Sequence, residues 1–186
     1  MRSLTDFQSS ENSTRLQIGF APAQSCFVVF RKAGAKPEPT TRNFPVTKEA
    51  VRVGGPWRVS FDPAWGGPNQ PADFTNLDDW TSRPEPGIRY YSGTAVYRTT
   101  FDVPQAEKTS SFLDLGTVRH LARVRLNNQD LGVVWCAPWG VDLPAGLLKS
   151  SGNRLEIAVT NVWANRLIGD EQETADCEWL PGYMGS

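Results

Sequence analysis

Residues 118–163 constrain the fold more than any other part of the chain. Residues 122–126 alternate three apolar side chains with two arginines, and Leu155, Ile157 and Val159 recur at every second position further on. This period is typical of a β-strand with one face in a core. The sequence Asn-Asn-Gln-Asp at 127–130 suits a tight turn, because asparagine tolerates left-handed backbone. The stretch therefore predicts half-buried strands joined by turns.

Short strands of the same kind are predicted at 15–20, 26–32, 51–62, 90–103 and 112–116. Turn-forming residues separate them, and 77–80 is predicted to be a single helical turn capped by Thr75 or Asn76. Roughly eight short strands without a long amphipathic helix indicate a sandwich. We therefore predict an all-β fold, an antiparallel jelly-roll β-sandwich. The residues predicted to be buried are Trp57, Phe61, Tyr97, Phe101, Leu113, Leu115, Val124, Leu126, Leu155, Ile157 and Val159.

Composition changes along the chain suggest two parts. Residues 1–14 are polar and are expected to be a loose lead-in, whereas 26–30 are continuously apolar and are expected to be buried on both faces. The Pro- and Gly-containing stretch 34–45 is the natural linker. We therefore predict lead-in strands in 1–49, which fit the end of a preceding domain, and the sandwich in 50–186.

The motifs of several catalytic classes are absent from the sequence. It contains no nucleophile elbow, phosphate-binding loop, dinucleotide fingerprint or metalloprotease helix. The single histidine, His120, is interpreted as a structural or surface residue. The acid-rich run 170–173, with Asp176 and Glu178, is interpreted as solvated surface. No residue is therefore predicted to be catalytic.

Tryptophans beside turn-forming residues are the more informative feature. Trp65, Trp135, Trp139, Trp163 and Trp179 lie next to Gly, Pro or Asn rather than in the middle of strands. Aromatic faces stack on the C–H surfaces of sugar rings, and neighbouring polar side chains can bind the hydroxyls. Packing at the sandwich ends or against another domain is the alternative. The predicted ligand-binding residues are Trp135, Trp139, Asp142, Trp163, Asn165 and Arg166.

Several segments resemble known carbohydrate-active proteins. One resemblance, to the sugar-binding β-sandwich of family 2 glycoside hydrolases, lies in RVRLNNQDLGVVWCAPWGVDLPAGLLKSSGNRLEIAVTNVWANR. A more specific one lies in GPWRVSFDPAWGGP, PGIRYYSGTAVYRTTFDVP and NRLIGDEQETADCEW. These three segments resemble the C-terminal, galactose-binding-like β-sandwich region of the large bacterial rhamnosidases of glycoside hydrolase family 106. The match covers roughly residues 27–179.

The resemblance implies a non-catalytic carbohydrate-binding or accessory β-sandwich from a multidomain, rhamnosidase-like glycoside hydrolase. Catalytic acids of that family belong to a preceding barrel domain, which takes about 250 residues, more than the 186 residues of this chain. The chain on its own is therefore not expected to be an enzyme. Two alternatives stay open: a small free-standing glycoside hydrolase using a carboxylate pair, and a structural interdomain module without a ligand.

The resemblance also implies where a ligand would bind. In family 2 enzymes the loop after the strand-turn motif and the loop leaving the final strand lie at one end of the domain. Here these loops carry Trp135 and Trp139, and Trp163, Asn165 and Arg166, so they are expected to converge. The implied partners are carbohydrate, with rhamnose-containing plant polysaccharide as the first candidate, and the parent catalytic domain.

Charge and hydropathy exclude other partners. Lys and Arg together number 19 and Asp and Glu 20, so a net charge of -1 attracts neither nucleic acid nor an anionic membrane. No apolar run approaches the roughly 20 residues of a membrane helix, and residues 1–11 lack the apolar centre of a secretory signal. The resemblance implies an exported parent, periplasmic or extracellular, whose signal would lie upstream.

The cysteines and carboxylates of the sequence give only weak support for a metal site or a disulfide. Cys26, Cys136 and Cys177 have no zinc-ligand spacing. Cys26 is interpreted as a small buried hydrophobe, and a Cys136–Cys177 disulfide is left open. No cofactor is predicted apart from a candidate structural calcium ion, which such sandwiches often hold. Its candidate ligands are Asp62, Asp114 and Glu156.

Overall fold

The computed structural model describes residues 4–20, 24–30, 43, 48–104 and 111–172. The chain divides into two compact units, Met1–Ala50 and Val51–Ser186. That the first unit ends a preceding domain stays a prediction.

The first unit contains an antiparallel hairpin of β1 (Phe7–Ser9) and β2 (Thr14–Leu16). Residues 1–14 therefore include a strand, where a loose lead-in was expected. Buried Asn43 is hydrogen-bonded to the two residues before β1. Its Oδ1 accepts from the Thr5 and Asp6 amides at 2.9 and 3.0 Å, and its Nδ2 donates to the Asp6 carbonyl.

The prediction of a buried strand at 26–30 was wrong. None of these residues is in a strand, the side chain of Phe27 is 98% exposed, and Cys26 is exposed rather than buried. An apolar run is buried only where other elements cover it, and among its described residues the first unit offers just one short hairpin.

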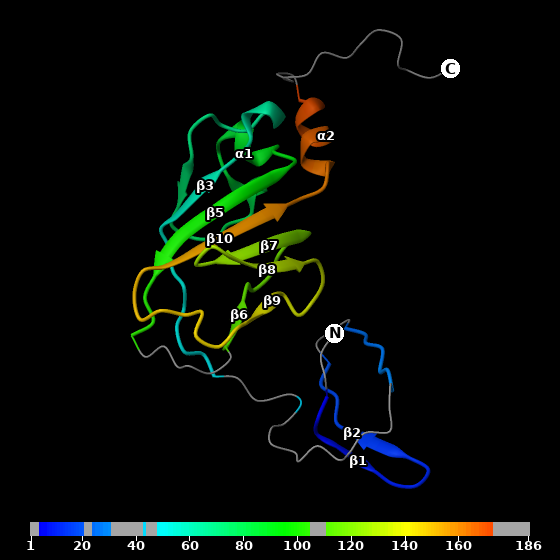
Figure 1. Cartoon of the computed structure of the whole chain (residues 1–186). Coiled ribbons are helices and arrows are strands. Elements are labelled where there is room, and N and C mark those ends of the chain that lie inside the picture. Colours follow the sequence, from blue (N-terminus) through cyan, green and yellow to red (C-terminus); the bar gives the residue numbers. More distant parts are fainter. Residues whose placement is uncertain (1–3, 21–23, 31–42, 44–47, 105–110, 173–186) are drawn as a thin grey trace, which may run out of the picture. The chain divides into compact units, whose positions relative to one another are not determined.

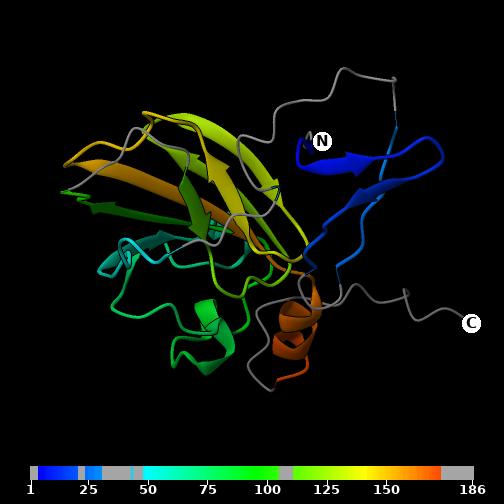
Figure 2. The same ribbon diagram turned by 90° about the horizontal axis from the view of Figure 1, so that it is seen from below.

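The second unit is an antiparallel β-sandwich (Figure 1), which confirms the predicted fold class. Its larger sheet has the strand order β4-β3-β5-β10-β7-β8, and β6 and β9 form a two-stranded sheet. The smaller sheet lies next to β7 and β8 (Figures 1 and 2). The bounds are β3 Trp57–Ser60, β4 Ala72–Phe74, β5 Thr94–Phe101, β6 Ser111–Asp114, β7 Leu121–Leu126, β8 Gln129–Val134, β9 Gly140–Leu143 and β10 Asn153–Thr160.

Short helices gather at one end of this unit. The helices are α1 (Pro86–Arg89) and α2 (Ala164–Asp170), which lie side by side in Figures 1 and 2, with the 3-10 turns η1 (Pro63–Trp65) and η2 (Trp80–Ser82). The expected helical turn thus begins at Trp80, and its cap is Asp79 instead of Thr75 or Asn76, because the Asp79 carboxylate accepts from the Thr81 amide. Within the described residues no helix is long and apolar enough to cross a membrane.

The core follows the period of two. Of the eleven residues predicted to be buried, seven are: Trp57, Phe61, Tyr97, Val124, Leu126, Leu155 and Ile157. Phe101, Leu113, Leu115 and Val159 are half-buried and pack against them. The β7–β8 hairpin turns through Asn127 and Asn128, whose φ angles of 51° and 69° are those of the predicted left-handed turn.

Six aromatic residues form one cluster on the β3, β4 and β5 side: Trp57, Phe61, Phe74, Trp80, Tyr91 and Tyr97. We call this the aromatic cluster. Its ring pairs meet edge to face, except that Phe61 and Phe74 are tilted at 35°; the centroids lie 5.0 Å apart for Phe61 and Tyr91 and 5.5 Å apart for Phe61 and Trp80. The Trp80 indole N–H donates to the Tyr97 hydroxyl. The buried polar atoms of the two rings therefore satisfy each other.

Candidate functional site

A cleft of about 640 Å³ opens where the strands of the large sheet end, and we call it the end cleft. Its floor is the inner face of the sheet, with Tyr97 from β5 and Ile157 and Val159 from β10. Three segments make its walls: 77–81 before and within η2, 115–120 before β7, and 161–165 after β10. The His120 amide donates to the Thr160 carbonyl at 3.2 Å, which ties the second wall to the end of β10.

The floor and inner walls of the end cleft are apolar. The apolar lining residues are Trp57, Leu77, Trp80, Tyr97, Leu115, Val118, Ile157, Val159, Val162 and Ala164. Tyr97 and Trp80 also belong to the aromatic cluster, so the floor is anchored in the core. The η2 turn sets the first wall, because its capping residue Asp79 accepts from both the amide and the hydroxyl of Thr81 and Trp80 then points inward.

Polar side chains also line the end cleft: Asp78, Asp79, Thr81, Thr117, Arg119, His120, Asn161 and Asn165. Asn161 is structural, since its side chain bonds the Gly93 amide and the Tyr91 carbonyl, both at 2.9 Å. The side chains of Arg119, His120 and Asn165 form no hydrogen bond with another described residue. Donors and acceptors are therefore available to a ligand.

The charges of the end cleft are shaped by local contacts. Hydrogen bonds from the backbone and side chain of Thr81, with help from the nearby Arg119 guanidinium, lower the pKa of Asp79. Asp79 is thus a carboxylate at neutral pH. On the floor, burial raises the pKa of Tyr97, with smaller contributions from Asp79 and Asp78, so the hydroxyl stays neutral and accepts from Trp80.

The predicted aromatic loops do leave one end of the sheet. Val134 of β8 and Val159 of β10 both pair with Ala122 of β7, so β8 and β10 end at the same end of the sheet. Trp135 follows β8 and Trp163 follows β10 at that end. Their side chains are 71% and 76% exposed, whereas Trp139 is half-buried against the core. None of the three lines the end cleft.

The three predicted polar residues are divided among different places. Asn165 lines the end cleft. Asp142 lies exposed on β9, between the buried Val141 and Leu143. Arg166 lines a separate pocket, so the structure does not bring the six predicted site residues together, and their role in binding stays a prediction.

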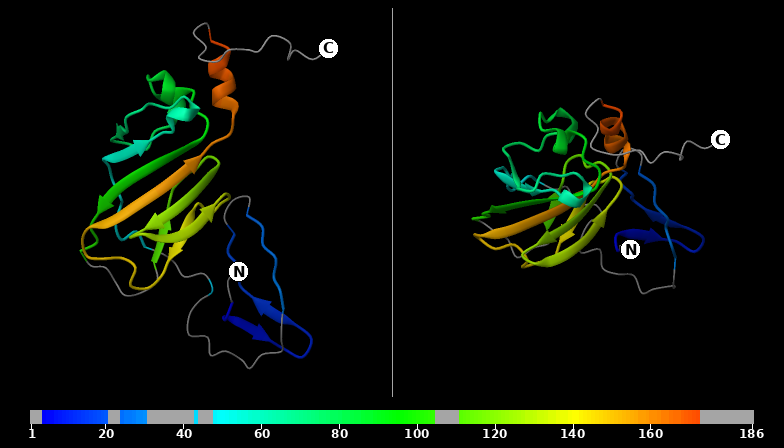
Figure 3. Two further views of the ribbon diagram at one scale, coloured as in Figure 1. Left: turned by 45° about the horizontal axis from the view of Figure 1, so that its top comes forward. Right: turned by 90° about the horizontal axis from the view of Figure 1, so that it is seen from above.

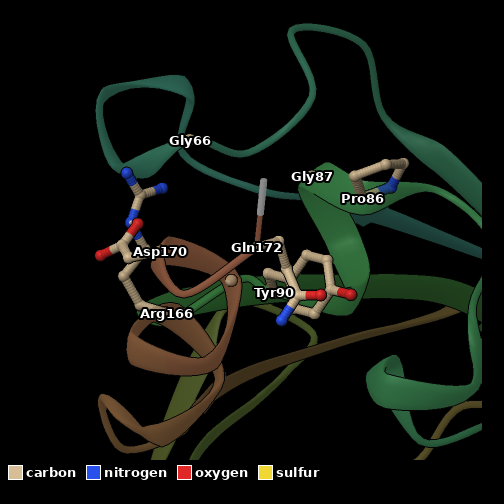
Figure 4. Close-up of a pocket in the computed structure, with 8 residues that line it drawn as sticks. Gly66, Pro86, Gly87, Tyr90, Arg166, Asp170 and Gln172 are labelled. Atoms are coloured by element: carbon tan, nitrogen blue, oxygen red, sulfur yellow. The ribbon is translucent and has the colours of Figure 1, made fainter. Parts of the chain in front are cut away.

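That separate pocket, of about 120 Å³, lies between α1, α2 and the loop at Gly66 (Figure 4). Asp170 Oδ1 is 3.1 Å from Arg166 Nε, and the Asp170 side chain is 11% exposed. This oxygen accepts no hydrogen bond from a described residue. Gly169 permits the close packing, because an added Cβ would lie 2.7 Å from Tyr90 Cβ.

Helix α2 turns polar residues toward its own domain and exposes apolar side chains on its other face. Gly169 and Asp170 face its own domain: Gly169 packs on Tyr90, the Asp170 side chain is 11% exposed, and the backbone amide of Arg166 donates to Ser92 Oγ at 2.9 Å. Leu167 and Ile168 are exposed together with Trp163, and the helix continues beyond the end of β10 (Figure 3). We call these three residues, Trp163 at the N-cap and Leu167 and Ile168 within the helix, the apolar stripe of α2.

The proposed calcium ligands do not come together. Asp62 caps η1, Asp114 accepts from the Gly116 amide at 2.8 Å, and Glu156 pairs with Arg98 at 2.9 Å. No group of three metal-binding side chains occurs among the described residues. Cys136 is exposed, and Cys177 and Trp179 lie outside the described residues, as does the run beyond Gln172.

The sequence pattern does not indicate most of the end cleft. It predicts a structural or surface role for His120 and marks none of Asp78, Asp79 and Arg119 as a site residue. They come from segments far apart in the chain, so spacing alone carries no signal. A local hint existed in Asp-Asp-Trp at 78–80, where an acidic residue precedes a helical turn.

No family model matches the chain. It is 38% identical over 133 residues to a Formosa agariphila protein provisionally named beta-glucuronidase, a match covering 70% of this chain and 11% of that protein. In fold it is similar to a rhamnosidase from Novosphingobium sp. PP1Y, with a TM-score of 0.63 and 34% identity over 76% of this chain and 14% of that one.

A Ruminococcus gnavus beta-glucuronidase shares the fold at a TM-score of 0.51 and 19% identity, covering 63% of this chain and 22% of that one. The chain thus spans only 11% of the length of the curated relative it matches. It is related to one part of much larger glycoside hydrolases.

Proposed function

We propose that this chain is a non-catalytic carbohydrate-binding accessory β-sandwich of a multidomain, rhamnosidase-like glycoside hydrolase, and that the end cleft binds the saccharide. The similar proteins support the context, because the chain corresponds to 11% and 14% of their lengths. The remainder of such proteins has room for a catalytic domain.

The observation that carries the proposal is the composition of the end cleft. The same cleft is lined by an apolar floor that includes Tyr97 and by the polar side chains of Asp79, Arg119 and His120. Sugars present the same two chemistries, apolar C–H faces and hydroxyls that both donate and accept. A concave, mostly apolar site with a few polar groups is the usual form of a small-molecule site.

The chemistry of the cleft favours binding over hydrolysis. A glycosidase needs one carboxyl group with a raised pKa as acid and a second one across the substrate. The pKa of Asp79 is lowered instead, and Asp78 lies beside it in the same wall. The free-standing hydrolase therefore has less support than the accessory domain.

A structural role between domains is favoured by a separate observation, the apolar stripe of α2. Trp163, Leu167 and Ile168 are each more than half exposed, at 76%, 55% and 55%. Exposed apolar patches mark interaction sites in soluble proteins. The two functions are compatible, because the stripe lines neither the end cleft nor the pocket at Arg166.

Calorimetry of the full chain against a panel of neutral and acidic oligosaccharides, including rhamnose-containing pectic fragments, tests the proposal. We expect binding that Arg119→Gln weakens about tenfold, since hydrogen bonds to a charged donor are among the stronger polar contacts. Arg58→Gln is the matched control, because Arg58 is exposed on β3 outside the cleft. Absence of binding to every saccharide, or equal losses in both variants, would contradict it.

A further inference from the structure

The geometry points to a neutral saccharide carrying an apolar substituent as the ligand of the end cleft. This inference rests on the proposed function and specifies its ligand class. Two independent features carry it, the balance of charged side chains around the cleft and the extent of its apolar floor.

The charged residues of the end cleft leave an excess of negative charge. Among the residues that line the cleft, the carboxyl groups of Asp78 and Asp79 stand against a single guanidinium, that of Arg119. Arg119 already acts on Asp79, whose pKa it helps to lower. A sugar carboxylate entering the cleft would meet two carboxylates and one cation that is partly neutralised.

Asp79 acts on the floor as well as on the wall. Burial is the main cause of the raised pKa of Tyr97, and among the charged groups Asp79 makes the largest contribution, while Arg83 opposes it and Asp78 adds to it. Charge repulsion in a partly desolvated cleft is weakly screened. A uronate is therefore disfavoured relative to its neutral analogue, whose hydroxyl can donate to a carboxylate.

The floor favours an apolar group beside the sugar ring. Tyr97, Ile157 and Val159 lie in adjacent positions on β5 and β10, since Ile157 pairs with Tyr97, and all line the cleft. The volume of about 640 Å³ lies in the range of sites for drug-sized ligands. Tyr97 and Ile157 are themselves buried, so the apolar surface that a substituent such as an aryl group would contact comes from the half-buried Val159 and from the exposed Leu77 and Val162.

The charge argument is tested with matched ligands that differ only at C6. The pairs are 4-nitrophenyl β-glucoside with its glucuronide and 4-nitrophenyl β-galactoside with its galacturonide, measured by calorimetry on the full chain. We expect the neutral member to bind about tenfold more tightly, as expected for one unfavourable charge interaction. Asp78→Asn should reduce that ratio about threefold, and Asp73→Asn, on exposed β4, should leave it unchanged.

The floor argument is tested with phenyl and methyl β-glucosides. Burial of the ring should make the phenyl glycoside about tenfold tighter, and Val159→Thr should reduce that advantage about threefold by adding a hydroxyl to the floor. Val133→Thr is the same change on β8 outside the cleft. If Val159→Thr fails to fold, the exposed cleft residue Leu77, changed to Ser, gives the same test.

Equal or tighter binding of the uronates, or no advantage for the phenyl glycoside, overturns the inference while leaving the proposed function intact. The inference is also overturned if none of the neutral glycosides binds. If, in addition, no saccharide of the wider panel binds, the proposed function is contradicted as well.

Discussion

Two groups of aromatic residues in the same domain have opposite environments. Members of the aromatic cluster, such as Trp80 and Tyr97, are 7% exposed, whereas Trp135 and Trp163 are 71% and 76% exposed. Trp80, Trp135 and Trp163 all lie in turns or just beyond strand ends. The contrast shows that an aromatic residue beside a turn is buried only when its turn folds back over the sheet, as η2 does and the loop after β8 does not.

The largest effect is expected from removing Trp80. Trp80→Ala should lower the free energy of unfolding by about 3–5 kcal/mol, the usual cost of deleting a buried large aromatic ring. Urea denaturation measures it. Trp80→Phe keeps most of the ring but leaves the Tyr97 hydroxyl without its donor, so a loss of about 1–2 kcal/mol is expected. A loss below 1 kcal/mol for Trp80→Ala would show that η2 does not close the core.

A smaller effect is expected at Trp139, which is half-buried. Trp139→Ala should destabilise the fold by about 1–2 kcal/mol, less than Trp80→Ala, because the ring contacts the core on one side. Its saccharide affinity should match the parent, since Trp139 does not line the end cleft. An affinity loss of about 1–3 kcal/mol, typical of an aromatic anchor, would instead place Trp139 in the binding site.

A pH titration separates buried from exposed phenols. The pKa of Tyr97 is raised in the folded state, so its contribution to stability is complete below its unfolded pKa near 10 and is lost as pH rises toward the folded pKa. Unfolding free energies at pH 8 to 11 should therefore fall less steeply for Tyr97→Phe than for the parent. Parallel curves would mean that Tyr97 titrates alike in both states.

The smallest effect on stability is expected for the exposed tryptophans. Trp163→Ala and Trp135→Ala should each change the free energy of unfolding by no more than about 0.5 kcal/mol, as for most surface substitutions. Thermal and urea unfolding measure the change. A loss of 2 kcal/mol or more in either variant would remove the contrast with the aromatic cluster.

Local patterns predicted the sheet better than the site. Val124, Leu126 and Leu155 were placed correctly in the core, because the period of two depends only on neighbouring residues in one strand. The same reasoning failed at 26–30, because an apolar run does not reveal whether a second surface exists to cover it. Asp79 was missed because two adjacent acidic residues resemble exposed surface, although this one caps the turn that buries Trp80.

The sequence by itself determined the antiparallel sandwich, the Asn127 and Asn128 hairpin and the relation to glycoside hydrolases. The alternation of apolar and polar residues, the turn-forming residues and the resemblance to known families can all be recognised from consecutive residues. Tertiary structure alone decided that Asp79, Arg119 and Asn165 share a cleft while Arg166 lies in another pocket. The physical reason is that a binding site depends on the convergence of distant segments, which follows from strand register and the packing of η2 and α2.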